Sequence, residues 1–114
     1  GSITSYSNSV KQSLLGVQEE TLTKFGAVSE ETVIEMATGA CRKLQSTIAI
    51  SISGIAGPEG GTTEKPVGTI WIAISNGEIT ETKKLVGTKI REANINYAIS
   101  QALYICINFV KKHY

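Results

Sequence analysis

The chain has 114 residues, of which 41% are apolar and 18% charged, and its formal net charge is +1. This composition is typical of one globular domain, and it argues against a nucleic-acid-binding surface, which needs a clustered excess of Lys and Arg. The apolar runs are shorter than the roughly 20 residues of a membrane span, and no signal-peptide pattern is found. We therefore expect a cytoplasmic protein with neither nucleic acid nor membrane as a partner.

Short elements are expected at the start of the chain. Ile3–Tyr6 is typical of a short strand, and a brief helix is expected over Val10–Leu15, where Gly16 would end it. Glu19–Lys24 adds one further helical turn. The first long element follows these pieces.

A strong helix is expected to begin after Ser29, whose hydroxyl is a good cap. Glu30 and Glu31 come next, where carboxylates complement the helix dipole. Apolar residues then recur at helical spacing, at Val33, Ala37, Ala40, Cys41 and Leu44. Such a face must pack against another layer.

Three strands are expected after this helix. Ile48–Ser53 alternates isoleucines with small residues, and the small face leaves room for a helix or a ligand. Thr69–Ser75 is almost continuously apolar, as in a central strand covered on both faces. Asn76-Gly77 predicts a type I′ hairpin turn, after which Ile79–Val86 returns antiparallel as an edge strand.

A final helix is expected over Lys89–Lys112, with one apolar stripe formed by Ile95, Ile99, Ala102, Leu103, Cys106, Phe109 and Val110. The elements together predict an α/β fold: a single domain over residues 1–114, with a mixed β-sheet flanked by helices in three layers. Phe109 and Trp71 are expected in the core rather than against a ligand.

The two cysteines and the single histidine give no sign of a metal site or cofactor. Cys41 and Cys106 are each in phase with an apolar helix face, which favours free thiols, with a disulfide between them as the alternative. His113 lies one residue from the chain end, so we expect no catalytic role for it.

The most informative segment is the long connection between the first two expected strands. Gly54–Gly68 contains five glycines and two prolines, and loops of this length in small domains are usually functional or disordered. Glycine allows close approach to main-chain N–H groups, which can bind anions such as phosphates. The alternative is a strand connection that simply needs many turn residues.

Three segments, Ser5–Lys11, Phe25–Glu30 and Ser51–Trp71, together resemble the CinA C-terminal domain family, and the resemblance spans the chain. Family members include nicotinamide-nucleotide amidases, which convert nicotinamide mononucleotide and water to nicotinic acid mononucleotide and ammonia. In the family, a strand and helix with a Glu-Ser-Cys-Thr-Gly-Gly motif come first, and its serine is the expected nucleophile. This sequence does not contain that motif, so the resemblance implies a domain without its first strand and helix, and inactive alone.

The resemblance also implies roles for individual residues. Lys11 would be the base that activates the serine, with Tyr6 positioning substrate or sharing the proton. Ser53 would bind substrate or the oxyanion, and Arg91 a phosphate, although Gly87–Arg91 departs from the Gly-Asp-Arg of the family. Main-chain groups would complete the pocket at Gly54, Gly57, Gly60 and Gly61.

Each role has an ordinary structural alternative. Lys11 could be a solvated residue on a short helix, Ser53 a hydroxyl bonded to its own loop, and Arg91 a surface residue paired with Glu92. The functional interpretation requires Lys11, Ser53 and Arg91 to converge on one cavity beside the glycine-rich loop.

A second functional class also remains open. The chain could be a non-catalytic nucleotide-binding, regulatory or assembly domain of a CinA-like competence/damage-inducible protein. In either case we expect a homo-oligomer, because a missing strand exposes backbone ladder groups and apolar surface.

Overall fold

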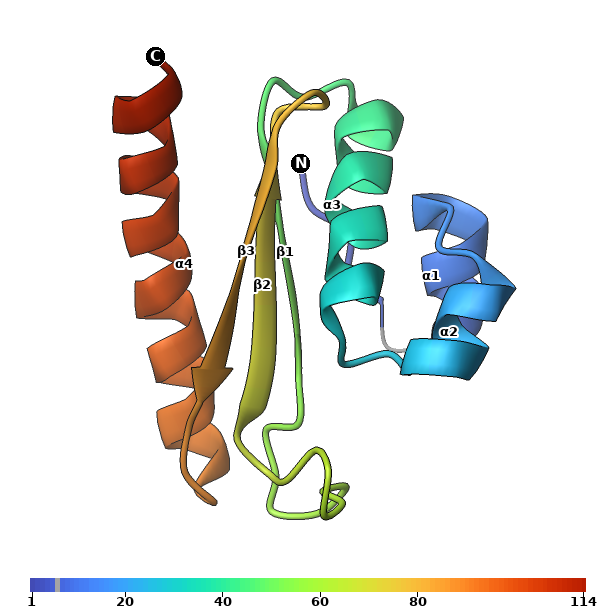
Figure 1. Cartoon of the computed structure of the whole chain (residues 1–114), viewed down its shortest axis with the longest axis vertical. Helices are drawn as coiled ribbons and strands as arrows, with labels where there is room; N and C mark the ends of the chain where they lie inside the picture. The colour runs from blue at the N-terminus through green and yellow to red at the C-terminus, as the bar shows by residue number, and fades with distance from the viewer. Residues whose placement is uncertain (6) are drawn as a thin grey trace.

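The computed structural model describes residues 1–5 and 7–114 (Figure 1). Its elements are, in chain order, α1 (Asn8–Leu15), α2 (Glu19–Phe25), α3 (Glu30–Leu44), β1 (Ala49–Gly54), β2 (Thr69–Ser75), β3 (Thr80–Val86) and α4 (Arg91–His113). This confirms the α/β class. Residues 1–5 belong to no strand, whereas a strand was expected to begin at Ile3, and Tyr6 lies outside the described residues.

The helix ends follow the capping signals of the sequence. The Ser29 hydroxyl accepts a hydrogen bond from the Thr32 N–H at 3.2 Å, which confirms Ser29 as the cap of α3. Gly16 has φ of 72° and ends α1, as expected. At the other end of α1, the Ser7 hydroxyl accepts from the Val10 N–H at 3.3 Å, so the helix begins earlier than predicted.

The sheet has the order β1-β2-β3, and the described strands are antiparallel throughout. Ser51 of β1 faces Ala73 of β2, and Ile72 faces Lys83 of β3. The expected mixed pairing is absent from these three strands because the glycine-rich connection returns the chain directly beside β1. β2 is the buried central strand and β3 an edge strand, as expected.

The hairpin between β2 and β3 is confirmed, but its expected type I′ turn is wrong. Residues 76–79 connect the strands, and of Asn76 and Gly77 only the glycine has a positive φ, 91°. The Asn76 side-chain oxygen accepts the N–H groups of Glu78 and Ile79 at 3.0 and 2.7 Å. A side-chain turn thus replaces the left-handed backbone that a type I′ turn requires.

The expected three layers are present: α3 covers one face of the sheet and α4 the other, while α1 and α2 lie beyond α3 (Figure 1). The buried residues of the α3 side are Leu15, Val17, Leu22, Val33, Met36, Ala37 and Ala73. Those of the α4 side are Ile70, Ile72, Leu85, Ala98 and Ala102. The small face of β1 does receive a helix, because the Ser51 hydroxyl donates to the Val33 carbonyl oxygen of α3 at 2.6 Å.

The predicted apolar stripe of α4 is only partly buried. Ala102 and Phe109 face inward together with Asn94 and Ala98. Four other members of the predicted stripe are exposed, namely Ile95, Ile99, Leu103 and Val110. Two neighbouring rows at four-residue spacing are both apolar on this helix, and the sheet covers one of them. Neither α4 nor any other helix in the described part of the chain has the length and apolar character to cross a membrane.

The end of α4 is tied to β3 through Glu81. One carboxylate oxygen of Glu81 lies 3.0 Å from His113 Nε2 and accepts from Lys112 Nζ at 2.9 Å. These hydrogen bonds, from His113 first and Lys112 second, lower the pKa of the Glu81 carboxyl. The His113 ring also packs on Phe109, with ring centroids 4.6 Å apart.

The cysteines are free thiols, in agreement with the preferred interpretation of the sequence. Cys41 is buried on α3 and its Sγ lies 3.3 Å from the Ser75 carbonyl oxygen. Cys106 is half-buried on α4. The two helices lie on opposite faces of the sheet, which keeps the thiols apart (Figure 1).

Candidate functional site

The glycine-rich loop lies at one end of the sheet, together with the end of β1 and the start of α4 (Figure 1). Ser53 is the penultimate residue of β1, and Arg91 is the first residue of α4. Lys11 lies in α1, which packs against the outer side of α3. Of Lys11, Ser53 and Arg91, the last two therefore lie at the ends of elements that border the loop.

The loop is an ordered connection with its own main-chain hydrogen bonds. At its base, the Ile55 N–H donates to the Thr69 carbonyl at 2.9 Å, and the Gly68 N–H donates to the Ile55 carbonyl at 2.8 Å. At its tip, the Thr62 N–H donates to the Lys65 carbonyl at 2.8 Å. Part of the unusual composition therefore serves the turn geometry of a strand connection.

The four glycines assigned to the pocket differ in what surrounds them. A Cβ on Gly57, whose φ is 90°, would lie 2.5 Å from Val67 Cγ1, and a Cβ on Gly61 would lie 2.6 Å from the Val67 nitrogen. Both glycines are thus needed for the loop to pack on itself. Gly54 lies against β2, while Gly60 is exposed and offers open main chain at the loop surface.

Lys11 is buried, contrary to the solvated alternative. Lys11 is 7% exposed, and its Nζ donates a hydrogen bond to the Ser5 carbonyl oxygen at 2.9 Å. Burial lowers the pKa of the Lys11 amine because a charged ammonium loses hydration. An amine of this kind can exist in its neutral form closer to physiological pH, as a general base requires. Its expected partner Tyr6 lies outside the described residues.

Ser53 and the loop are both anchored on the connection between α2 and α3. The Ser53 hydroxyl donates to the Ala27 carbonyl oxygen at 2.7 Å, so its partner belongs to this connection and not to its own loop. Lys65 Nζ donates to the Phe25 carbonyl oxygen two residues earlier. Lys65 was not among the predicted site residues, although it lies in the Ser51–Trp71 segment that carries the family resemblance.

Arg91 reaches the loop directly. Its Nη1 donates to the Gly57 carbonyl oxygen at 3.2 Å, a different contact from the surface pair with Glu92. The side chain is exposed, and a guanidinium with one N–H engaged keeps further donors for an anion.

Each of the three key side chains therefore bonds a main-chain carbonyl group: Lys11 that of Ser5, Ser53 that of Ala27, and Arg91 that of Gly57. Among the described residues, no hydrogen bond or ion pair joins any two of the three. Their convergence on a common ligand stays a prediction.

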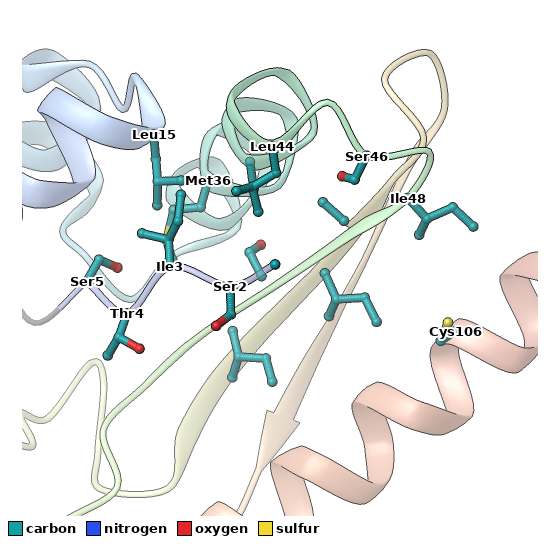
Figure 2. A pocket seen from close by; sticks show the side chains of 16 residues that line it. Ser2, Ile3, Thr4, Ser5, Leu15, Met36, Leu44, Ser46, Ile48 and Cys106 are labelled. Carbon is teal, nitrogen blue, oxygen red and sulfur yellow. The ribbon is translucent and has the colours of Figure 1, made fainter.

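A large groove lies elsewhere, along the outer edge of β1 (Figure 2). It has a volume of about 690 Å³ and runs between residues 49–52 of β1 and residues 1–5, with Cys106 at its rim. None of Lys11, Ser53 and Arg91 lines it. One of its walls is the edge of β1, which pairs with no other described strand.

Comparisons with known proteins agree with this architecture. The chain is 47% identical over 113 residues to a CinA-like protein of Prochlorococcus marinus, covering 97% of this chain and 26% of the relative. It is 57% identical over 70 residues to the nicotinamide-nucleotide amidohydrolase PncC of Escherichia coli, covering 61% of this chain and 42% of the relative. The competence damage-inducible protein A of Klebsiella pneumoniae superposes with a TM-score of 0.90 at 36% identity, over 96% of this chain and 68% of that one.

The chain spans about a quarter of the length of the CinA-like relatives that it matches. The model of the CinA C-terminal domain matches residues 1–110. The chain belongs to the CinA C-terminal domain family.

Proposed function

We propose that the protein carrying this domain is a cytoplasmic amidohydrolase that converts nicotinamide mononucleotide and water to nicotinic acid mononucleotide and ammonia. The observation that carries the proposal is the buried amine of Lys11, whose pKa is lowered by burial. Amide hydrolysis with a serine nucleophile needs a base that is unprotonated near neutral pH, and burial shifts the pKa of a lysine in that direction. The similarity to PncC supports the choice of substrate.

In this mechanism the neutral Lys11 Nζ takes the proton of a serine hydroxyl as the serine oxygen attacks the carboxamide carbon. The tetrahedral oxyanion collapses, the proton passes to the leaving nitrogen, and ammonia departs from a serine ester. Water then attacks the ester carbon while Lys11 takes a proton from it. The ester bond breaks, Lys11 returns its proton to the serine oxygen, and the carboxylic acid formed loses its proton to solvent and leaves as the carboxylate.

Substrate binding is assigned to the loop end of the sheet. The Ser53 hydroxyl and exposed main chain near Gly60 would contact the nucleotide, and the Arg91 guanidinium would bind its phosphate. A helix start beside Arg91 adds main-chain N–H donors that favour an anion.

The groove beside β1 is where we place the serine-bearing strand that the family resemblance implies. One wall is the free backbone edge of β1, and the groove is also lined by the apolar residues Leu15, Met36, Ile48 and Ile50. A strand lying parallel to β1 would end beside Ser53, because carboxyl ends of parallel strands meet at one edge of a sheet. A serine following that strand would then lie at the loop end of the molecule.

The test compares ammonia release from nicotinamide mononucleotide by two proteins, the 114-residue chain and a version extended by a strand and helix that carry the serine motif. We expect turnover by the extended protein at about 1 s⁻¹ or faster, as in ordinary enzymes. The short chain, and an extended protein whose motif serine is changed to Ala, should release none.

A binding role is the second candidate. It is favoured by the fact that Ser53 and Ser7, the two serines that could stand in for the missing nucleophile, are already engaged, Ser53 in a hydrogen bond to the Ala27 carbonyl oxygen and Ser7 as a helix cap. Titration calorimetry with nicotinamide mononucleotide decides between the two. An extended protein that binds the nucleotide but releases no ammonia would replace the amidase by a nucleotide-binding domain.

Self-association of the short chain is a further expected result. The free edge of β1 and the exposed row of α4 both favour pairing with another copy. Light scattering coupled to gel filtration should give a larger mean number of copies per particle for the short chain than for the extended protein. Monomers in both cases would contradict the expectation.

A further inference from the structure

Asn94 is the most completely bonded buried polar side chain near the candidate site. It lies in the first turn of α4 and is 1% exposed. Its Nδ2 donates to the carbonyl oxygens of Ala56 at 2.9 Å and Thr88 at 2.8 Å, while Oδ1 accepts the Thr88 N–H at 2.7 Å. A buried amide is costly unless its donors and acceptors are satisfied, and here they are.

These bonds join segments far apart in the chain. The Asn94 side chain donates to the Ala56 carbonyl oxygen at the start of the glycine-rich loop, and Arg91, three residues earlier in the same helix turn, donates to the next carbonyl oxygen, that of Gly57. On the other stem of the loop, the Gly87 N–H donates to the Gly68 carbonyl at 2.8 Å. Side chains of the first turn of α4 therefore donate hydrogen bonds to two successive carbonyl groups of the loop.

The Asn94 side chain lies so close to Gly87 that no side chain fits at that position. A Cβ built there would lie 2.3 Å from Asn94 Oδ1. The orientation of the amide is also fixed, because exchanging its oxygen and nitrogen would place Oδ1 against two carbonyl oxygens.

We propose that Asn94 is the positioning residue that couples Arg91 to the glycine-rich loop, so that the guanidinium and the Ala56–Gly57 main chain form one rigid site for the phosphate of a nucleotide. The substrate part of this inference rests on the proposed amidase, whereas the rigidity part does not. Arg91 supplies the charge, and Asn94 fixes the helix turn from which Arg91 projects.

Hydrogen–deuterium exchange of the 114-residue chain tests the coupling without any substrate. Asn94→Ala should accelerate exchange of residues 54–61 and 86–92 by about tenfold or more, since it removes the hydrogen bonds that close both segments. Exchange in β2 and α3 should stay unchanged. The matched control is Asn96→Ala, which alters an exposed asparagine on the same helix.

A second variant covers the case in which Asn94→Ala does not fold. Gly87→Ala places a methyl group against Oδ1 of Asn94, and it should accelerate exchange in the same two segments. Uniform acceleration over the whole chain, or none in either segment, would overturn the inference.

The substrate arm uses the extended protein. Asn94→Ala and Arg91→Ala should each raise KM for nicotinamide mononucleotide by about tenfold or more, with a smaller change in kcat, as expected for a lost charged hydrogen bond. The double variant should have a KM no higher than that of Arg91→Ala alone. Neither change should alter kcat/KM for nicotinamide riboside, which lacks the phosphate.

The two proposals fail in different ways. If the unaltered extended protein releases no ammonia, the amidase is wrong and the exchange experiment still decides the role of Asn94. If it is active and Asn94→Ala keeps the KM of the unaltered protein, the phosphate role of Asn94 is wrong and the amidase stands.

Discussion

Lys11→Met in the extended protein is expected to lower kcat for nicotinamide mononucleotide by about 10²- to 10⁴-fold, the usual contribution of a general base. The free energy of unfolding should fall by no more than about 1 kcal/mol, because the lost hydrogen bond to Ser5 is offset by removal of a buried ammonium. Activity by ammonia release and stability by urea unfolding check the two halves. A large loss of activity with little loss of stability identifies a catalytic group.

The pH dependence gives a separate check on the same residue. Because burial lowers the pKa of Lys11 in the folded state, the neutral amine becomes available below the ordinary lysine value of about 10.4. The kcat/KM of the extended protein should therefore rise with pH up to the lowered pKa and then level off.

Stability should follow the same group with a defined sign. Between the lowered folded pKa and about 10.4, the unfolded chain binds more protons than the folded one, so the free energy of unfolding rises with pH. Lys11→Met should remove that rise. Lys24→Met, at an exposed lysine of α2, is the control that should change neither activity nor the pH profile. Equal losses in both variants would contradict the assignment of Lys11 as the base.

Local signals in the sequence were sufficient to predict most of the secondary structure. Ser29 and Gly16 bound their helices as expected because capping depends on residues within one turn. The Asn76-Gly77 pair predicted a hairpin correctly but not its turn, since the asparagine side chain competes with the backbone for the same N–H groups.

The candidate site was less predictable because its contacts span long stretches of sequence. Composition and family resemblance point to the loop and to Arg91, but the hydrogen bond between Arg91 and Gly57 joins residues 34 positions apart, which no local pattern predicts. Asn94 lies on a helix where an asparagine is usually exposed, and its burial follows from contacts with a loop 38 residues away. The burial of Lys11 similarly depends on how α1 packs against α3, which no local pattern specifies.

The largest difference between the predicted and the observed fold is which residues of α4 face the sheet. A pair of substitutions tests the observed orientation of this helix. Phe109 and Leu103 belong to the same predicted stripe, yet Phe109 is 0% exposed and Leu103 is 61% exposed. Phe109→Ala should lower the free energy of unfolding by about 3–5 kcal/mol, because it removes a buried ring and leaves a cavity. Leu103→Ala should change it by less than about 0.5 kcal/mol, as surface substitutions usually do.

Urea unfolding of both variants measures the difference, and protein concentration separates its causes. A loss of about 3–5 kcal/mol is a large share of the total stability of an ordinary domain, so Phe109→Ala should be only marginally folded. A similar loss in Leu103→Ala at every concentration would mean that α4 is rotated and that the predicted stripe faces the sheet. A loss that appears only at high concentration would place Leu103 in a contact between copies, because association stabilises the folded state by mass action. The concentration series therefore distinguishes an error in the orientation of α4 from a covered outer face of the same helix.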